Sequence, residues 1–99
     1  MRHRAARAIP APCWKNATIV FTVLSNTVRL GVLLRLIERE WSVGELAADM
    51  KMGQSAISQH LGKLREAGVV CARKDRQALY SHCSDETVIL LLSEFGIIR

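Results

Sequence analysis

The stretch that decides the fold is GQSAISQHLGKLREAGVV, residues 53–70. Within it, three apolar residues recur at the spacing of one helical face: Ile57, Leu61 and Leu64. Gly68 follows at the place where a residue of left-handed conformation commonly ends a helix. We therefore predict a helix over residues 54–67 whose apolar face is buried.

The opposite face of this helix carries amides and hydroxyls instead of the Glu and Lys that dominate ordinary exposed helix faces. Short side chains of this kind, near a helix N-terminus, suit the base edges and phosphates of DNA. Gly62 on this face would let a backbone approach closely. We predict that the helix reads DNA through six residues: Gln54, Ser55, Ser58, Gln59, His60 and Lys63. His60 lies on a flank, where it could equally hydrogen-bond inside the domain.

Two helices are predicted upstream. The first spans about 27–39, with Asn26 as its cap and an apolar stripe at i, i+3, i+4 and i+7: Leu30, Leu33, Leu34 and Ile37. The second begins at a Ser-x-x-Glu capping box formed by Ser42 and Glu45. A short turn at residues 51–53 then joins it to the 54–67 helix. Two short helices joined by such a turn indicate a helix-turn-helix.

The remaining segments complete a winged helix-turn-helix, mainly α with a β-hairpin, in the order α-α-α-α-β-β-α. Residues 15–25 are apolar and β-branched, so this pattern leaves helix and strand open. Residues 69–74 and 77–82 are expected to form the hairpin, with Asp75 and Arg76 as its loop. Ser84, Asp85 and Glu86 open the last helix, because acidic residues stabilise a helix N-terminus.

The net charge of +5 is concentrated in two segments. Residues 1–15 carry four basic residues and no acidic one, and residues 51–76 carry six basic residues against two acidic ones. Such asymmetry predicts a polyanionic partner, with double-stranded DNA the first candidate. The hairpin is expected to contact phosphates or the minor groove through four residues: Arg73, Lys74, Arg76 and Gln77.

The chain length and composition fit one small domain. We expect residues 1–14 to form a basic, disordered arm and residues 15–99 to form the DNA-binding and dimerisation domain. No apolar run of 18 residues occurs, so no membrane segment is expected. Three cysteines cannot form a closed disulfide framework, which favours a reduced, cytoplasmic chain. No motif of catalytic residues is present, so the sequence predicts no enzyme.

A homodimer is predicted because two apolar sets exceed what a small three-helix core can bury. They lie in the first segment and the last helix: Ile19, Val20, Val23, Leu24, Val88, Leu91, Leu92 and Phe95. Two copies would also place two recognition helices on one face, which matches a palindromic DNA site.

Three pieces of the sequence resemble the ArsR/SmtB family of bacterial repressors: LSNTVRLGVLLRLI, SVGELAADMKMGQSAISQHLGKLREAGVV and ARKDRQALYS. The resemblance runs from Leu24 to Phe95 and covers some 70 of the 99 residues. The second piece resembles most the metal-independent branch that includes a rhizobial nodulation repressor. The resemblance implies a homodimer that binds an imperfect inverted repeat and blocks transcription. Many family wings carry Gly at the tip, where this chain has Arg76, and the tail before Trp14 has no counterpart.

Metal-sensing members of the family carry cysteines at the start of the helix that precedes the recognition helix. Ser42 and Gly44 stand at those positions here, so a soft metal would lack its thiolate ligands. A second family site needs His and carboxylates on the last helix, but His82 precedes that helix. We expect no metal site and no cofactor.

The cysteines leave a second interpretation open. Cys83 is expected to be a buried structural thiol, and Cys71 is expected to lie opposite Tyr80 in the hairpin. Cys13 lies among cations, which lower the pKa of a thiol. The alternatives to an effector-free repressor are therefore a thiol- or redox-responsive repressor that pairs Cys13 with Cys71 or Cys83, and a winged-helix module that binds protein.

Overall fold

The computed structural model describes residue 18 and residues 20–98. The predicted arm at residues 1–14, its Cys13, and Ile19 of the predicted dimer interface lie outside the described residues. Residues 20–24 are helical, which settles the open choice between helix and strand in the first apolar segment. Among the described residues, no helix is both long and apolar enough to cross a membrane.

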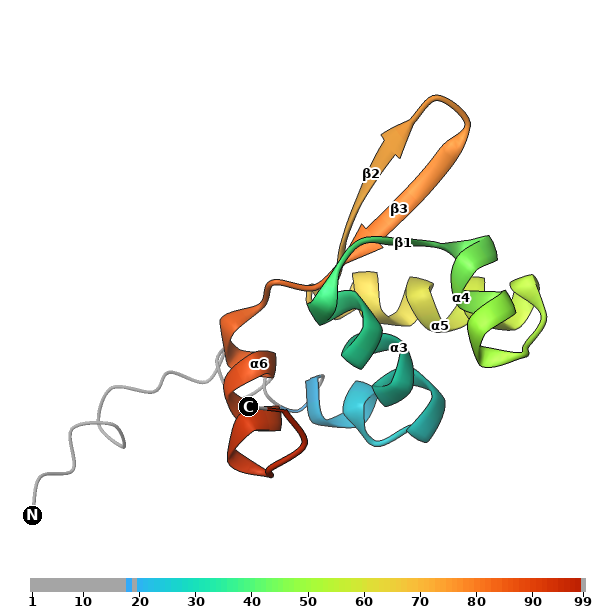
Figure 1. The fold of residues 1–99 in the computed structure, drawn as a ribbon. Coiled ribbons are helices and arrows are strands. Elements are labelled where there is room, and N and C mark those ends of the chain that lie inside the picture. Colours follow the sequence, from blue (N-terminus) through green and yellow to red (C-terminus); the bar gives the residue numbers. More distant parts are fainter. Residues whose placement is uncertain (1–17, 19, 99) are drawn as a thin grey trace, which may run out of the picture.

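Helix α3 (Thr27–Glu38) forms the centre of the domain (Figure 1). Its N-terminus is capped as predicted, because the Asn26 side-chain oxygen accepts hydrogen bonds from the backbone N–H groups of Val28 and Arg29 at 2.9 and 3.1 Å. Three residues of the helix are buried in the core: Val32, Leu33 and Leu36.

Helices α4 (Val43–Met50) and α5 (Gln54–Glu66) form the helix-turn-helix. The predicted capping box is present: the Ser42 hydroxyl accepts from the Glu45 N–H at 3.1 Å, and the Glu45 carboxylate accepts from the Ser42 N–H at 2.9 Å. The apolar face of α5 is buried as predicted, at Ile57, Leu61 and Leu64. Gly68 follows α5 with a φ of +77°, which confirms its expected left-handed conformation.

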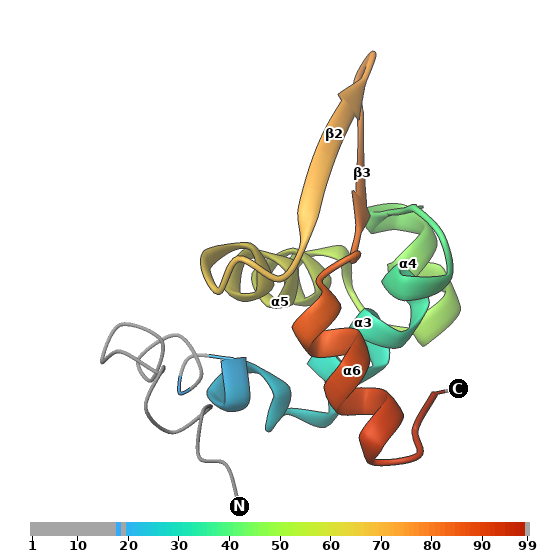
Figure 2. The ribbon, with the colours of Figure 1, turned by 90° about the vertical axis from the view of Figure 1, so that its left-hand side faces the viewer.

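The hairpin belongs to a three-stranded antiparallel sheet of order β1-β3-β2. Strand β1 (Trp41–Ser42) precedes α4 and was not predicted; β2 (Cys71–Asp75) and β3 (Ala78–His82) form the wing. The wing projects from the helical layer on the side opposite to α6 (Figures 1 and 2).

The predicted loop of the hairpin was wrong by one residue. Asp75 pairs with Ala78 inside the ladder, and Arg76 and Gln77 form the loop, with Arg76 in the left-handed region at φ 61°. Cys71 consequently lies opposite His82 and not opposite Tyr80. Burial gives little guidance on register here, since every residue of β2 is exposed, and the loop conformation decides it.

Helix α6 (Glu86–Glu94) closes the core. The Asp85 side chain caps it by accepting a hydrogen bond from the Val88 N–H at 2.9 Å, as the acidic opening of the helix predicted. Val88 and Leu92 pack into the same core cluster as Val23 of the helical segment 20–24. The whole cluster is aliphatic except for the Cys83 thiol.

Candidate nucleic-acid interface

The outward face of α5 presents five of its six predicted DNA contacts to solvent: Gln54, Ser55, Ser58, Gln59 and Lys63. Apart from the neighbouring backbone of α5 itself, no atom of the described residues lies within 4 Å of the position that a Cβ on Gly62 would occupy, so the centre of this face is open. Because the opposite face is buried in the core, the orientation of α5 is fixed by packing. The polar face therefore stands outward as one rigid surface.

His60, the sixth, is half-buried on the flank of α5. Burial lowers the pKa of its imidazole, and the nearby charges of Arg29 and Lys63 lower it further. No described residue supplies a hydrogen-bond partner to its buried Nδ1 atom, so the internal role considered for His60 is not observed at that atom. Arg29 of α3, which was not predicted as a site residue, therefore lies near His60 of the recognition helix.

The N-terminus of α5 lies close to that of α4. A Cβ on Gly44 would stand 3.7 Å from Nε2 of Gln54 and 4.0 Å from Oγ of Ser42. The three residues therefore bring the start of the recognition helix against the preceding helix. The same place is where metal-sensing relatives were expected to carry cysteines, and the Ser42 hydroxyl is already engaged as a helix cap.

The four predicted wing contacts do not behave alike. All four are exposed on the hairpin: Arg73, Lys74, Arg76 and Gln77. Lys74 and Arg76 form no ion pair with any other described residue. Arg73 instead binds Glu40 through two hydrogen bonds of 2.8 and 2.9 Å. That pairing lowers the pKa of the Glu40 carboxyl and raises the pKa of Arg73.

Of the seven predicted dimerisation residues that the structure describes, three are buried, three are half-buried and one, Phe95, is exposed. Val23, Val88 and Leu92 are buried in the core of the protomer itself. Val20 and Leu24 are half-buried against that core. An apolar cavity of about 300 Å³ separates the helical segment 20–24 from α6, and Leu24, Leu91, Leu92 and Phe95 line it together with residues that the prediction omitted: Phe21, Leu30 and Ile97.

Three large apolar side chains remain exposed in the helical segment 20–24 and in or directly after α6, and two of them, Phe21 and Leu90, were not predicted. Phe21 is 54% exposed, Leu90 63% and Phe95 71%. Leu90 falls outside the apolar stripe of α6, so only its size and hydrophobicity could have identified it. Their side chains, more than those of Val88 and Leu92, supply apolar area that the protomer leaves uncovered.

Within residues 18 and 20–98, no group of three or more His, Cys, Asp or Glu side chains is placed to hold an ion. Cys83 is 4% exposed, as expected for a structural thiol, and burial raises its pKa. Cys71 is exposed, and both thiols are free.

Comparison with known proteins agrees with this geometry. Residues 26–71, which contain α3, α4 and α5, match the model of the arsR family of bacterial regulatory proteins. The chain belongs to the ArsR family. The resemblance found in the sequence is therefore confirmed, and the chain is a helix-turn-helix transcriptional regulator.

Two curated relatives are similar to this chain over a longer stretch than the family model. The transcriptional activator HlyU of Vibrio cholerae is 39% identical over 73 residues, which cover 74% of this chain and 68% of HlyU. The biofilm growth-associated repressor of Agrobacterium fabrum is 37% identical over 94 residues, which cover 90% of this chain and 80% of the repressor.

A solved structure supports the branch that the sequence suggested. The crystal structure of NolR from Sinorhizobium fredii superimposes with a TM-score of 0.79 at 35% identity. The match covers 83% of this chain and 82% of that one. The winged helix-turn-helix architecture is thus shared with a regulator of the nodulation group.

Proposed function

We propose that this protein is a homodimeric repressor that binds an inverted-repeat operator in double-stranded DNA and has no metal-sensing site. The exposed polar face of α5, with Gly62 open at its centre, carries the proposal. Amide side chains can form paired hydrogen bonds with adenine, and the major groove admits a helix of this kind. A DNA partner places the protein in the cytoplasm.

The roles within the interface follow from chemistry and position. The amides and hydroxyls of α5 would read base edges: Gln54, Ser55, Ser58 and Gln59. The exposed cations would neutralise phosphates: Lys63, Lys74 and Arg76. Gln77, in the hairpin loop, and His60, on the flank of α5, remain proposed contacts. Arg73, expected in the phosphate group, is paired with Glu40 in this structure.

Repression is the sign of regulation that we favour. A dimer on a palindromic site covers the promoter and excludes other proteins from it. The relatives of this chain include one described as a repressor and one described as an activator, so regulation in both directions is found in the family. Reporter expression from the operator, with and without the protein, measures this sign directly.

The test of the proposed readout is Gln59→Ala on an operator selected from random DNA by the wild-type protein. Loss of a paired base contact should weaken operator binding by about 1–3 kcal/mol and leave binding to random DNA nearly unchanged. Ser84→Ala is the matched control, because Ser84 is exposed between β3 and α6, away from this face. Equal loss on both DNAs would contradict base reading by Gln59.

A further inference from the structure

One residue outside the recognition helix and the wing engages a predicted DNA contact. Glu40 lies between α3 and β1, and its two carboxylate oxygens accept hydrogen bonds from Nε and Nη2 of Arg73 at 2.8 and 2.9 Å. The two residues are 33 positions apart in the chain. This ion pair therefore ties strand β2 of the wing to the connection between α3 and the sheet.

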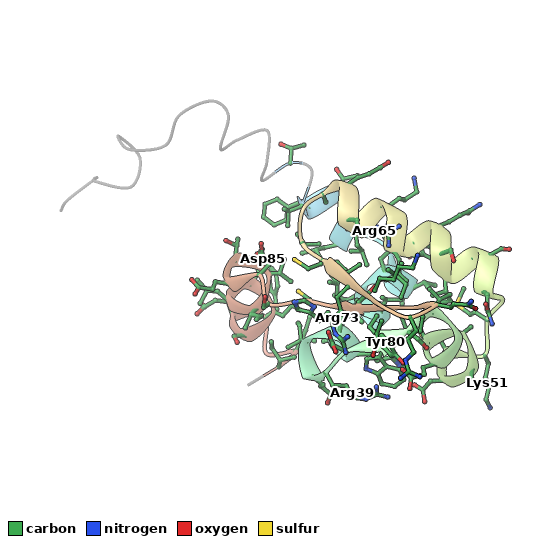
Figure 3. The ribbon with its side chains drawn as sticks, turned by 90° about the horizontal axis from the view of Figure 1, so that it is seen from above. Arg39, Lys51, Arg65, Arg73, Tyr80 and Asp85 are labelled. Carbon is green, nitrogen blue, oxygen red and sulfur yellow. The ribbon has the colours of Figure 1, made fainter. Side chains whose placement is uncertain are left out.

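Arg73 also contacts its cross-strand neighbour in the hairpin. It lies opposite Tyr80 in the ladder, and its guanidinium carbon is 5.1 Å from the centre of the Tyr80 ring. Figure 3 shows both side chains together on the side of the hairpin away from α5. His82 Nδ1 approaches the same Glu40 carboxylate at 4.0 Å. Lys74, the next residue along β2, points to the opposite face of the hairpin and has no such partner.

Carboxylate and phosphate compete for an arginine in the same geometry, since both accept paired hydrogen bonds from the guanidinium fork. In this structure Glu40 occupies the position that two phosphate oxygens would take. If Arg73 moved to a phosphate, the Glu40 carboxylate would lose its arginine partner while it stood near the DNA polyanion. The ion pair therefore opposes the use of Arg73 as a phosphate contact.

We propose that Glu40 is a positioning residue that sets the DNA specificity of the wing by holding Arg73. The pair orients the hairpin, and it withholds one cation per protomer from the sequence-independent attraction to phosphates. Binding to random DNA depends on that attraction, whereas operator binding also depends on base contacts. Glu40 thus raises the ratio of operator affinity to random-DNA affinity. The inference rests on the proposed DNA binding.

The test measures the slope of log affinity against log salt concentration for five proteins: wild type, Glu40→Gln, Arg73→Gln, the double variant Glu40→Gln/Arg73→Gln, and Lys74→Gln. Each phosphate contact contributes about 0.9 to this slope. Glu40→Gln should steepen the slope by about 0.9 per protomer and lower the ratio of operator to random-DNA affinity. The double variant should return to the wild-type slope, because the released cation is then absent.

The single variants separate the two roles of the pair. Arg73→Gln should leave the slope unchanged while it weakens operator binding through the hairpin orientation. Lys74→Gln should make the slope shallower by about 0.9 per protomer. Thermal unfolding and light scattering of each variant verify the fold and the oligomeric state.

Three results would overturn the inference. A shallower slope for Arg73→Gln, equal to that of Lys74→Gln, would show that Arg73 binds phosphate. An unchanged slope for Glu40→Gln would show that no cation is released. If Glu40→Gln weakened binding to operator and to random DNA equally, the ion pair would only stabilise the fold and would not set specificity. Absence of salt-dependent binding in all five proteins would instead contradict the proposed function itself.

Discussion

The imidazole of His60 is half-buried and lies near two cations, so its pKa differs from that of a free histidine. Burial lowers its pKa, with Arg29 and Lys63 acting in the same direction. The unfolded chain binds a proton with an ordinary pKa of about 6.5, whereas the folded chain resists protonation at that pH. More protons are then bound in the unfolded state, so folding stability falls as the pH drops below that value.

We therefore expect the free energy of unfolding to decrease between about pH 7.5 and pH 5, where carboxyl groups contribute little. Replacing His60 with Gln, which stays neutral, should flatten this dependence. Urea unfolding of both proteins across the interval measures the effect. A wild-type stability that rises as the pH is lowered would contradict the depressed pKa of His60.

Gly62 offers a residue-scale test that separates folding from binding. A Cβ at this position meets no atom of another described element within 4 Å, and Ala is favoured over Gly inside a helix by roughly 0.5–1 kcal/mol. Gly62→Ala should accordingly raise the melting temperature slightly. If the DNA backbone approaches this face closely, the same substitution should weaken operator binding. Improved stability with unchanged binding would place the DNA elsewhere.

At the scale of the elements, helix termini were predictable and strand register was not. Asn26, the Ser42–Glu45 capping box and Gly68 are local signals, because the groups that satisfy a helix end lie within three or four residues. The hairpin register depends on a left-handed φ at Arg76, and the adjacent sequence contains no residue pattern that predicts this conformation. The Glu40–Arg73 contact spans 33 residues and likewise has no local pattern.

The candidate site follows the same division. The polar face of α5 was predictable from a 100° step, because the buried stripe at Ile57, Leu61 and Leu64 fixes the direction of the remaining side chains. In the wing, composition identified the cations but did not show that Arg73 is paired. A basic residue becomes available to a phosphate only through its tertiary surroundings, and these require the structure.

The capping box provides a prediction about the helix-turn-helix as a unit. Ser42→Ala removes the hydroxyl that accepts from the Glu45 N–H, and loss of such a cap costs about 1 kcal/mol. Chemical denaturation should show this destabilisation. Ser55→Ala on the exposed face of α5 is the control and should not lower stability, since its side chain caps no helix. Equal behaviour of the two variants would contradict the stabilising role of the cap.

At the scale of the whole molecule, we expect a second copy to bind at the exposed apolar area around the cavity between residues 20–24 and α6. Phe21 and Phe95 line this cavity and are both more than half exposed, whereas Leu92 is buried and its substitution would disrupt the core. A symmetric contact through this area would relate the two copies of α5 by the same two-fold axis.

Phe95→Glu should therefore produce a folded monomer that binds the operator much more weakly than the wild type. Light scattering and circular dichroism measure the mass and the fold. Leu79→Glu is the matched control: Leu79 is also an exposed apolar residue but lies on the wing, so its variant should remain a dimer. A monomeric wild-type protein at micromolar concentration would rule out the proposed assembly.

The central claim is that this protein is a sequence-specific DNA-binding dimer, and one titration tests it most directly. Binding of the wild-type protein is measured at two salt concentrations, to a promoter fragment with an inverted repeat and to random DNA of equal length. Affinity for both DNAs should fall as salt rises, and the promoter should be bound at least about a thousandfold more tightly than random DNA. Equal affinity for the two DNAs, or no salt-dependent binding to either, would contradict this claim.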